Sequence, residues 1–234
     1  MKVAHIEARL KNTFLLPEKF IEGLPHKVAV FTTIQFMNSL EPIMKQIEAT
    51  GRETVVFKTG HTRHQGQILG CNVQKFKEYA NEEFDDFVYV GDGFFHPKAL
   101  LWKNEDKKVH YYNPFSGHYS TVDYSEMLGI KKKYTASIAK FYMSNKIGVL
   151  ISTKPGQFMI KRAYELEEEY PDKEFYFFID NTLDFNALED FNFIQCWINT
   201  ACPRIAFDDS IKITKPVVNM EDIKKERAKR ALIR

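Results

Sequence analysis

The sequence holds three cysteines, and two of them lie where a thiol could do chemistry. Cys71 follows Gly66-Gln67-Ile68-Leu69-Gly70, and Cys202 opens Cys202-Pro203-Arg204 after an apolar run, so both belong to loops with strong backbone constraints. Cys196 lies inside the run Ile194–Ile198, and we expect it to be a structural core thiol. An odd, low count argues against a disulfide framework. The cysteines are therefore either inert or parts of a site assembled in space.

Two polar loops could bind a ligand. The loop Gly91–Pro97 (GDGFFHP) follows an apolar run, and its glycines allow close backbone approach to a ligand. Asp92 and His96 are possible acid–base groups there, although a tight strand-to-helix turn would have the same composition. Because Pro97 replaces the third glycine, the dinucleotide pattern G-x-G-x-x-G is not met.

The second polar loop, Ser152–Gln157 (STKPGQ), joins a predicted strand to a predicted helix. Its backbone N–H groups could hold a carboxylate or phosphate, although simple helix capping is an equally good reading. His61 and His64 precede Cys71 and could bind zinc with it, but the spacing matches no common closed site. Histidines on a polar surface are the more usual case.

Composition narrows the possible classes of protein. The chain has 234 residues, 44% hydrophobic and 27% charged, with a formal net charge of +2. Because the positive and negative charges nearly balance, we do not expect binding of nucleic acid that is driven mainly by electrostatics. We expect no transmembrane helix, because no apolar stretch reaches 18 residues, and no signal peptide. A cytoplasmic location is the resulting expectation.

Apolar runs that predict strands alternate with segments of helical periodicity. The predicted strands are Val3–Ala8, Lys27–Thr33, Glu53–Lys58, Phe87–Val90, Lys108–Tyr112, Ile147–Ser152, Glu174–Ile179 and Phe193–Asn199. The predicted helices are Gln35–Thr50, Ser125–Ser144 with an interruption near Gly129, Gln157–Tyr170, a short turn at Ala187–Phe191 and a charged tail, Met220–Arg234.

The two halves of the chain echo each other. Thr32-Thr33-Ile34-Gln35-Phe36-Met37 and Ser152–Met159 both place hydroxyl residues at the end of a strand before a helix. Strands that alternate with helices predict an α/β fold of two similar modules, each a parallel sheet flanked by helices. We place the first module at residues 1–138 with Cys71, and the second at 139–234 with Cys202. Ligands of such folds bind at the carboxyl edge of the sheet.

Five motifs in order resemble the diphthamide-forming family, 2-(3-amino-3-carboxypropyl)histidine synthase. The motifs are Gly66–Asn72, Gly91–Pro97, Asn113–Gly117, Gly148–Lys154 with Gly156 and Gln157, and Ala201–Arg204 with Asp208 and Asp209. The family has three similar α/β modules, each of which supplies one cysteine to a [4Fe–4S] cluster. The resemblance matches Cys71 to the middle module and Cys202 to the last. It leaves the first module and its cysteine without a counterpart.

The resemblance implies a radical reaction of S-adenosylmethionine at the cluster, which transfers a 3-amino-3-carboxypropyl group to a histidine of elongation factor 2. We expect Cys71 and Cys202 to be metal ligands. The residues expected to hold S-adenosylmethionine are Gly91, Asp92, Gly93, His96, Ser152, Thr153, Lys154, Gln157 and Arg204. Arg204 would suit its carboxylate as a planar cation. Individual catalytic residues are not assigned.

The expected partners are elongation factor 2, an electron donor, and either a chain that supplies the missing module or a second copy of this chain. Direct binding of nucleic acid or membrane is not expected. One alternative is a non-catalytic partner or scaffold subunit, which would tolerate loss of Cys71. Another is a generic doubly wound enzyme that binds a nucleotide-like ligand without iron.

Overall fold

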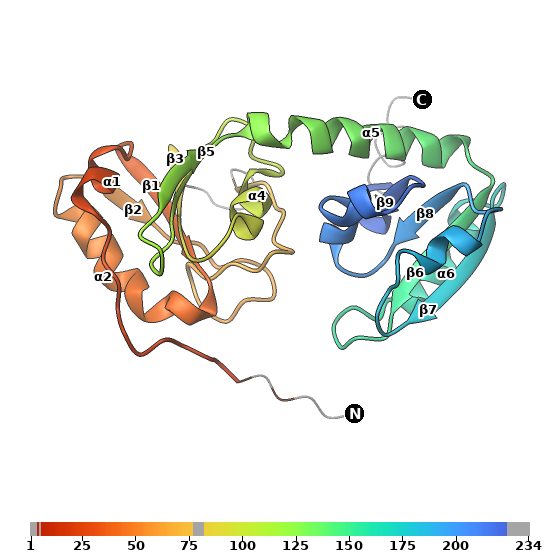
Figure 1. The fold of residues 1–234 in the computed structure, drawn as a ribbon, viewed down its shortest axis with the longest axis horizontal. Helices are drawn as coiled ribbons and strands as arrows, with labels where there is room; N and C mark the ends of the chain where they lie inside the picture. The colour runs from red at the N-terminus through yellow and green to blue at the C-terminus, as the bar shows by residue number, and fades with distance from the viewer. Residues whose placement is uncertain (1–3, 5, 77–81, 224–234) are drawn as a thin grey trace. The chain divides into compact units, whose positions relative to one another are not determined.

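The computed structural model describes residue 4, residues 6–76 and residues 82–223. The chain divides into two compact units, Met1–Leu128 and Gly129–Arg234 (Figure 1). The module boundary expected near residue 138 falls within helix α5, Leu128–Met143. In the part that the structure describes, no helix is long and apolar enough to cross a membrane.

The sheet of the first unit has the order β2-β1-β3-β4-β5. Strands β1, β2, β3 and β4 are parallel, and β5 runs antiparallel to β4 at the edge. The strands are β1 (Lys27–Thr32), β2 (Glu53–Val55), β3 (Asp86–Val90), β4 (Val109–Tyr112) and β5 (Tyr119–Val122). Strands β1 and β3 are apolar because both faces of the sheet are covered there.

Helices and aromatic side chains cover the two faces of this sheet. The helical elements are α1 (Glu18–Glu22), η1 (Ile34–Phe36), α2 (Met37–Glu48), α4 (Phe95–Leu101) and η2 (Tyr124–Met127). Helices α1 and α2 pack on Val28 and Val30 of β1. On β1, Phe31 alternates with these valines and contacts the rings of Phe57, Phe76 and Phe87. The carboxyl edge of the sheet is thus held between two packed layers.

The second unit contains a sheet in the order β7-β6-β8-β9, and all its pairings are parallel. Its elements after α5 are β6 (Lys146–Ser152), α6 (Ile160–Glu169), β7 (Glu174–Asp180), η3 (Ala187–Asp190), β8 (Cys196–Asn199), η4 (Pro203–Ala206), η5 (Asp209–Lys212) and β9 (Val217–Asn219). Gly148 on β6 leaves room for Trp197 on β8, because a Cβ at Gly148 would lie 2.2 Å from that ring.

The expected fold class is confirmed, with several local corrections. Strand β5 makes the first sheet mixed rather than fully parallel. Of the expected strand Val3–Ala8, the described residues form no strand, and Ile6 is 92% exposed. Helix α5 passes through Gly129 without interruption. Helix α6 begins at Ile160 rather than Gln157. The expected tail helix is helical at Met220–Ile223, and the rest lies outside the described residues.

Candidate functional site

The loop before Cys71 continues the carboxyl end of β1. The Thr32 N–H donates to Gly66 O at 2.8 Å, and the Ile68 N–H donates to Thr32 O at 2.9 Å. These bonds form a parallel bridge between Thr32 and Gln67 beyond the end of the strand. The loop is therefore attached to the sheet, and it carries Cys71 to the edge where ligands of parallel sheets bind.

A buried asparagine holds the turn at Cys71. Asn72 is 5% exposed, and its Oδ1 accepts hydrogen bonds from Leu69 N at 2.8 Å and from Thr59 Oγ1 at 3.1 Å. Its Nδ2 donates to Gly60 O at 2.8 Å. The half-buried Cys71 thus lies between residues whose backbone is fixed on both sides.

The loop after β3 is shaped by two tyrosines of the sheet. Gly91 lies against Tyr89, and a Cβ at Gly91 would lie 2.3 Å from the Tyr89 hydroxyl. Gly93 has φ of +63°, a conformation that favours glycine, and its N–H donates to the Tyr111 hydroxyl at 3.1 Å. Asp92 is exposed at the tip of this turn. The sequence pattern Gly-Asp-Gly is therefore explained by close packing and by the turn.

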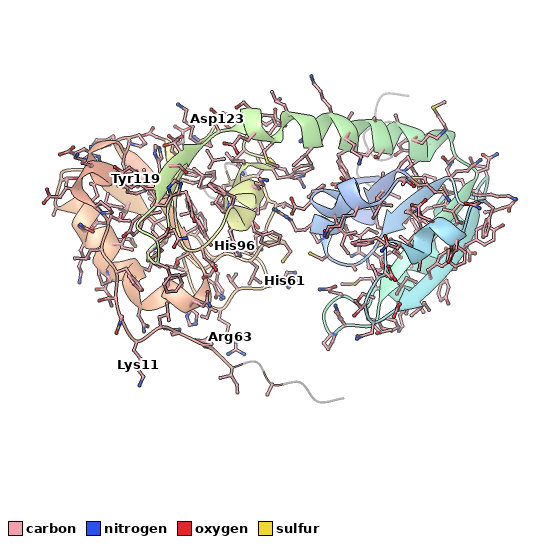
Figure 2. All side chains as sticks on the ribbon, in the orientation of Figure 1. Lys11, His61, Arg63, His96, Tyr119 and Asp123 are labelled. Carbon is pink, nitrogen blue, oxygen red and sulfur yellow. The ribbon has the colours of Figure 1, made fainter. Side chains whose placement is uncertain are left out.

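His96 is the second residue of α4, and its ring stacks on Tyr89. The ring centroids are 5.5 Å apart, and the Tyr89 hydroxyl lies 3.0 Å from His96 Nδ1. Burial, with a smaller contribution from Asp92, raises the pKa of Tyr89 well above its usual value. Tyr89 is therefore a neutral phenol at physiological pH. Its contact with His96 fixes the position of the imidazole. His96 itself lies on α4 (Figure 2).

The Cys71 loop and the Gly91–Pro97 loop meet directly. A Cβ at Gly70 would lie 1.8 Å from Cε1 of Phe95, so the Phe95 ring occupies the space that a side chain at position 70 would need. The ring itself is 45% exposed. Gly70 and Phe95, which are 25 residues apart in the sequence, are thus packed together next to Cys71 in the chain.

Of the two histidines considered as zinc ligands, His64 belongs to an ionic cluster. His64 Nε2 lies 2.8 Å from Glu7 Oε1, and Arg9 Nη2 contacts the other carboxylate oxygen at 2.7 Å. His61 is exposed on the same loop, near Arg63 (Figure 2). Among the described residues, no group of three or more His, Cys, Asp or Glu side chains could hold a metal ion.

In the second unit, the loop Ser152–Gln157 lies at the end of β6. The Ser152 hydroxyl is buried and accepts a hydrogen bond from the Lys154 N–H at 3.2 Å. The Thr153 N–H donates to Asp180 O at the end of β7, and Gln157 N donates to Lys154 O. The side chains of Thr153 and Lys154 are exposed. Because α6 begins at Ile160, this loop precedes the helix and does not form its first turn.

Cys202 lies at the same edge of the second sheet. The N–H and hydroxyl of Thr200, directly after β8, both donate to Leu150 O of β6, at 3.1 and 2.9 Å. Asn199 Nδ2 then donates to Cys202 O at 2.8 Å, and its Oδ1 accepts from Ala201 N at 3.1 Å. Asn199 is 2% exposed. The turn that presents the half-buried Cys202 is therefore fixed by a buried amide, as at Cys71.

Arg204 is 4% exposed, although the sequence reading places it in contact with a ligand. Its Nε donates to Asp208 Oδ2 at 2.5 Å. Since a buried cation is costly without an anionic partner, the ion pair accounts for Arg204 within η4. Arg204 and Cys202 remain two residues apart on the same short segment.

Cys196 differs from the other two cysteines in its surroundings. Its side chain is fully buried in the core between β6 and the helices of the second unit. Burial raises the pKa of the Cys196 thiol to about 12. Because metal ligands are thiolates, these surroundings support the expected structural role.

Sequence reasoning assigned no role to the groups that hold these loops. These are Asn72, Asn199, Asn219, Tyr89 and Tyr111. Asn199 ends an otherwise apolar strand, and this position is a signal that could have pointed to a structural amide.

The sequence matches a protein-family model described as "Putative diphthamide synthesis protein" over residues 1–228. It is 30% identical over 208 residues to the 2-(3-amino-3-carboxypropyl)histidine synthase of Pyrococcus horikoshii, with 87% of this chain and 58% of that protein covered. It is 31% identical over 204 residues to the protein of that name from Methanocaldococcus jannaschii, with 85% and 51% covered.

Solved structures agree with the sequence matches. The crystal structure of Dph2 from Pyrococcus horikoshii has a TM-score of 0.69 at 27% identity, and the match covers 85% of this chain and 56% of that one. The structure of the same protein with a 4Fe-4S cluster has a TM-score of 0.67 at 28% identity and the same coverage. The chain thus spans a little over half the length of these relatives.

Proposed function

Because this chain belongs to the diphthamide synthesis family, we propose that it is an iron–sulfur 3-amino-3-carboxypropyl transferase that uses S-adenosylmethionine. The observation that carries the proposal is the equivalent placement of two cysteines. Cys71 and Cys202 are each half-buried in a turn held by a buried asparagine, and the segment before each is hydrogen-bonded to the end of a strand of its own unit.

The donor chemistry of the two loops fits a [4Fe–4S] cluster. Thiolates are the usual ligands of iron–sulfur clusters, and both thiols lie at partly exposed positions rather than in the core. Each loop can supply one ligand without rearrangement of the sheet behind it. When bound, such a cluster would supply the electron that cleaves S-adenosylmethionine.

The polar loops at the same edges would hold the substrate. Arg204 would bind the methionine carboxylate, which would become its second anionic partner beside Asp208. A guanidinium suits this role because it binds carboxylates through a planar fork. Gly91 and Gly93 allow the backbone to approach a ligand closely, and Asp92 adds a carboxylate for the ammonium group. His96, held by Tyr89, would border the same loop.

The loop Ser152–Gln157 of the second unit carries polar groups of its own. Thr153 and Lys154 present exposed polar groups, whereas Ser152 and the Gln157 backbone shape the turn. We propose that this loop contacts the polar parts of S-adenosylmethionine.

The three-cysteine site would be completed from outside this sequence. Cys196 is the remaining cysteine, and its burial and raised pKa make it a poor ligand. We propose that another chain or a second copy supplies the third thiolate. The acceptor would be a histidine of elongation factor 2 in the cytoplasm, and a separate donor would supply electrons.

A partner or scaffold subunit is the second candidate function. The observation that favours it is that only Cys71 and Cys202 of the three cysteines lie at partly exposed positions, since Cys196 is buried. Such a subunit would bind a catalytic relative without holding its own cluster.

The test is anaerobic reconstitution with iron and sulfide, followed by iron and sulfide counts. Wild type, Cys71→Ala and Cys202→Ala are compared, and Cys196→Ala is the matched control. The proposal requires cluster formation that either loop variant abolishes and the control preserves; about four irons per site identify the cluster type. Equal iron in all four proteins would reject the two cysteines as ligands. Absence of iron, even with a relative's first module added, would favour the scaffold.

A further inference from the structure

The ring of Phe95 packs on Gly70 and occupies the space that a Cβ at that position would need. A Cβ at Gly70 would lie 1.8 Å from Cε1, 2.5 Å from Cζ and 2.8 Å from Cδ1 of Phe95. Such distances place the flat ring directly on the Gly70 backbone. Any larger residue at position 70 would force either the ring or the loop to move.

Both partners of this contact are attached to the rigid part of the unit. Gly70 lies between Ile68, which is bonded to Thr32, and Asn72, which is buried and makes three side-chain hydrogen bonds. Phe95 begins α4, whose Ala99 and Leu100 are fully buried. The contact therefore joins two anchored segments and sets the distance between them.

Cys71 is the next residue after Gly70, so the ring packs on the residue directly before the cysteine. The Phe95 ring is 45% exposed, so part of its apolar face stays at the surface of the unit. An apolar ring that stays at the surface beside a ligand residue can exclude water from whatever that residue binds.

We propose that Phe95 is a positioning residue for Cys71: its ring, which packs on Gly70, holds the cysteine loop and would shield from water the group that Cys71 binds. The inference deepens the proposed function and rests on it. The neighbouring Phe94 provides a matched control. It is similarly exposed, at 41%, but its ring packs on Tyr111 at a centroid distance of 4.9 Å.

The first experiment needs no cluster. The alkylation rate of Cys71 in the metal-free chain is measured by peptide mass spectrometry for Gly70→Ala, Phe95→Ala, the double variant and Phe94→Ala. Cys202 and Cys196 in the same samples serve as internal standards. We expect Gly70→Ala to raise the Cys71 rate about tenfold, equivalent to about 1.4 kcal/mol of easier local opening.

The double variant decides between positioning and general destabilisation. If the added methyl group acts by displacing the ring, Gly70→Ala has little further effect in the Phe95→Ala background. Equal effects of Gly70→Ala in both backgrounds would overturn the proposal. So would a Phe94→Ala effect on Cys71 as large as that of Phe95→Ala.

The second experiment uses the reconstituted protein. We expect Phe95→Ala to keep its iron, to lose it faster in air than wild type, and to show a higher reduction potential, because water stabilises the more negative reduced cluster. Phe94→Ala should match wild type. If wild type binds no iron, the proposed function fails; if Phe95→Ala binds iron with unchanged potential and air stability, this inference alone fails.

Discussion

The side chains of Asn199 and Asn219 form a buried hydrogen bond at the end of two neighbouring strands. Asn199 Nδ2 donates to Asn219 Oδ1 at 2.8 Å, and Asn219 Nδ2 donates onward to Pro203 O at 3.1 Å. Asn199 Nδ2 also donates to Cys202 O. The two amides thus connect the ends of β8 and β9 to the carbonyl groups of Cys202 and Pro203.

Replacement of Asn199 by alanine should therefore loosen the Cys202 turn. The change leaves Ala201 N and Cys202 O without the partner that they have now, at an expected cost of about 1–3 kcal/mol. Urea denaturation measures the cost, and alkylation of Cys202 measures the loosening. The exposed Asn186→Ala is the control. Unchanged alkylation of Cys202 in Asn199→Ala would show that the amide does not hold the turn.

The three cysteines should differ in reactivity in the metal-free chain. With a pKa of about 12, Cys196 is ionised at pH 8 to only about one part in ten thousand, and its side chain is buried. Iodoacetamide at pH 8 should modify Cys71 and Cys202 while Cys196 stays intact in the folded protein. Peptide mapping after timed quenching checks this order. Early modification of Cys196 would contradict its place in the core.

Acid stability should depend on Asp86. Burial tends to raise the pKa of this carboxyl, but hydrogen bonds from His110 and from Lys108 N lower it overall. Since the folded-state pKa lies below the unfolded value, Asp86 contributes stability above that value, and the contribution is lost as pH falls through the folded pKa. Asp86→Asn should flatten the loss of stability below about pH 4.

Urea denaturation at several pH values tests this prediction. The exposed Asp106→Asn serves as the control, because its carboxylate is 69% exposed. Parallel pH curves for wild type and Asp86→Asn would show that Asp86 is not responsible.

Loss of Arg204 should abolish binding of S-adenosylmethionine. Arg204→Ala also leaves the Asp208 carboxylate without its cation, so a folded variant is needed as well. Arg204→Lys keeps the charge but loses the planar fork, and we expect at least about tenfold weaker binding from it. Equilibrium dialysis with the reconstituted protein measures affinity, and Arg162→Ala, at an exposed ion pair, is the control. Wild-type affinity in Arg204→Lys would argue against bidentate recognition.

The sequence predicts the strands that are buried on both faces. Lys27–Thr33 and Ile147–Ser152 are nearly continuous apolar runs, and the structure has β1 and β6 there. Strand β5 carries Tyr119, Ser120 and Thr121 at an edge, where partial exposure removes the apolar signal. The described residues of the expected strand Val3–Ala8 form no strand, and Ile6 there is exposed to solvent.

The candidate site was only partly predictable, because its supporting contacts join residues that are distant in the sequence. The motifs single out Cys71 and Cys202 among the three cysteines, and the direction of the strands predicts that ligands bind at the carboxyl edge of each sheet. The supporting contacts depend on residues distant in sequence, such as the bond between Asn199 and Asn219 or the packing of Phe95 on Gly70. Burial of Arg204 likewise follows from tertiary packing, which a Cys-Pro-Arg tripeptide does not reveal.

The bridge between Thr32 and Gln67 has a consequence for how the protein would take up iron. Ile68 is fully buried, and its N–H is bonded to Thr32 O, so its amide hydrogen should exchange with solvent as slowly as those of the sheet. The segment that carries Cys71 should therefore move together with the sheet and not as a flexible loop. Under the proposed function, a metal ion that binds Cys71 would therefore meet a thiol on a segment that is already ordered.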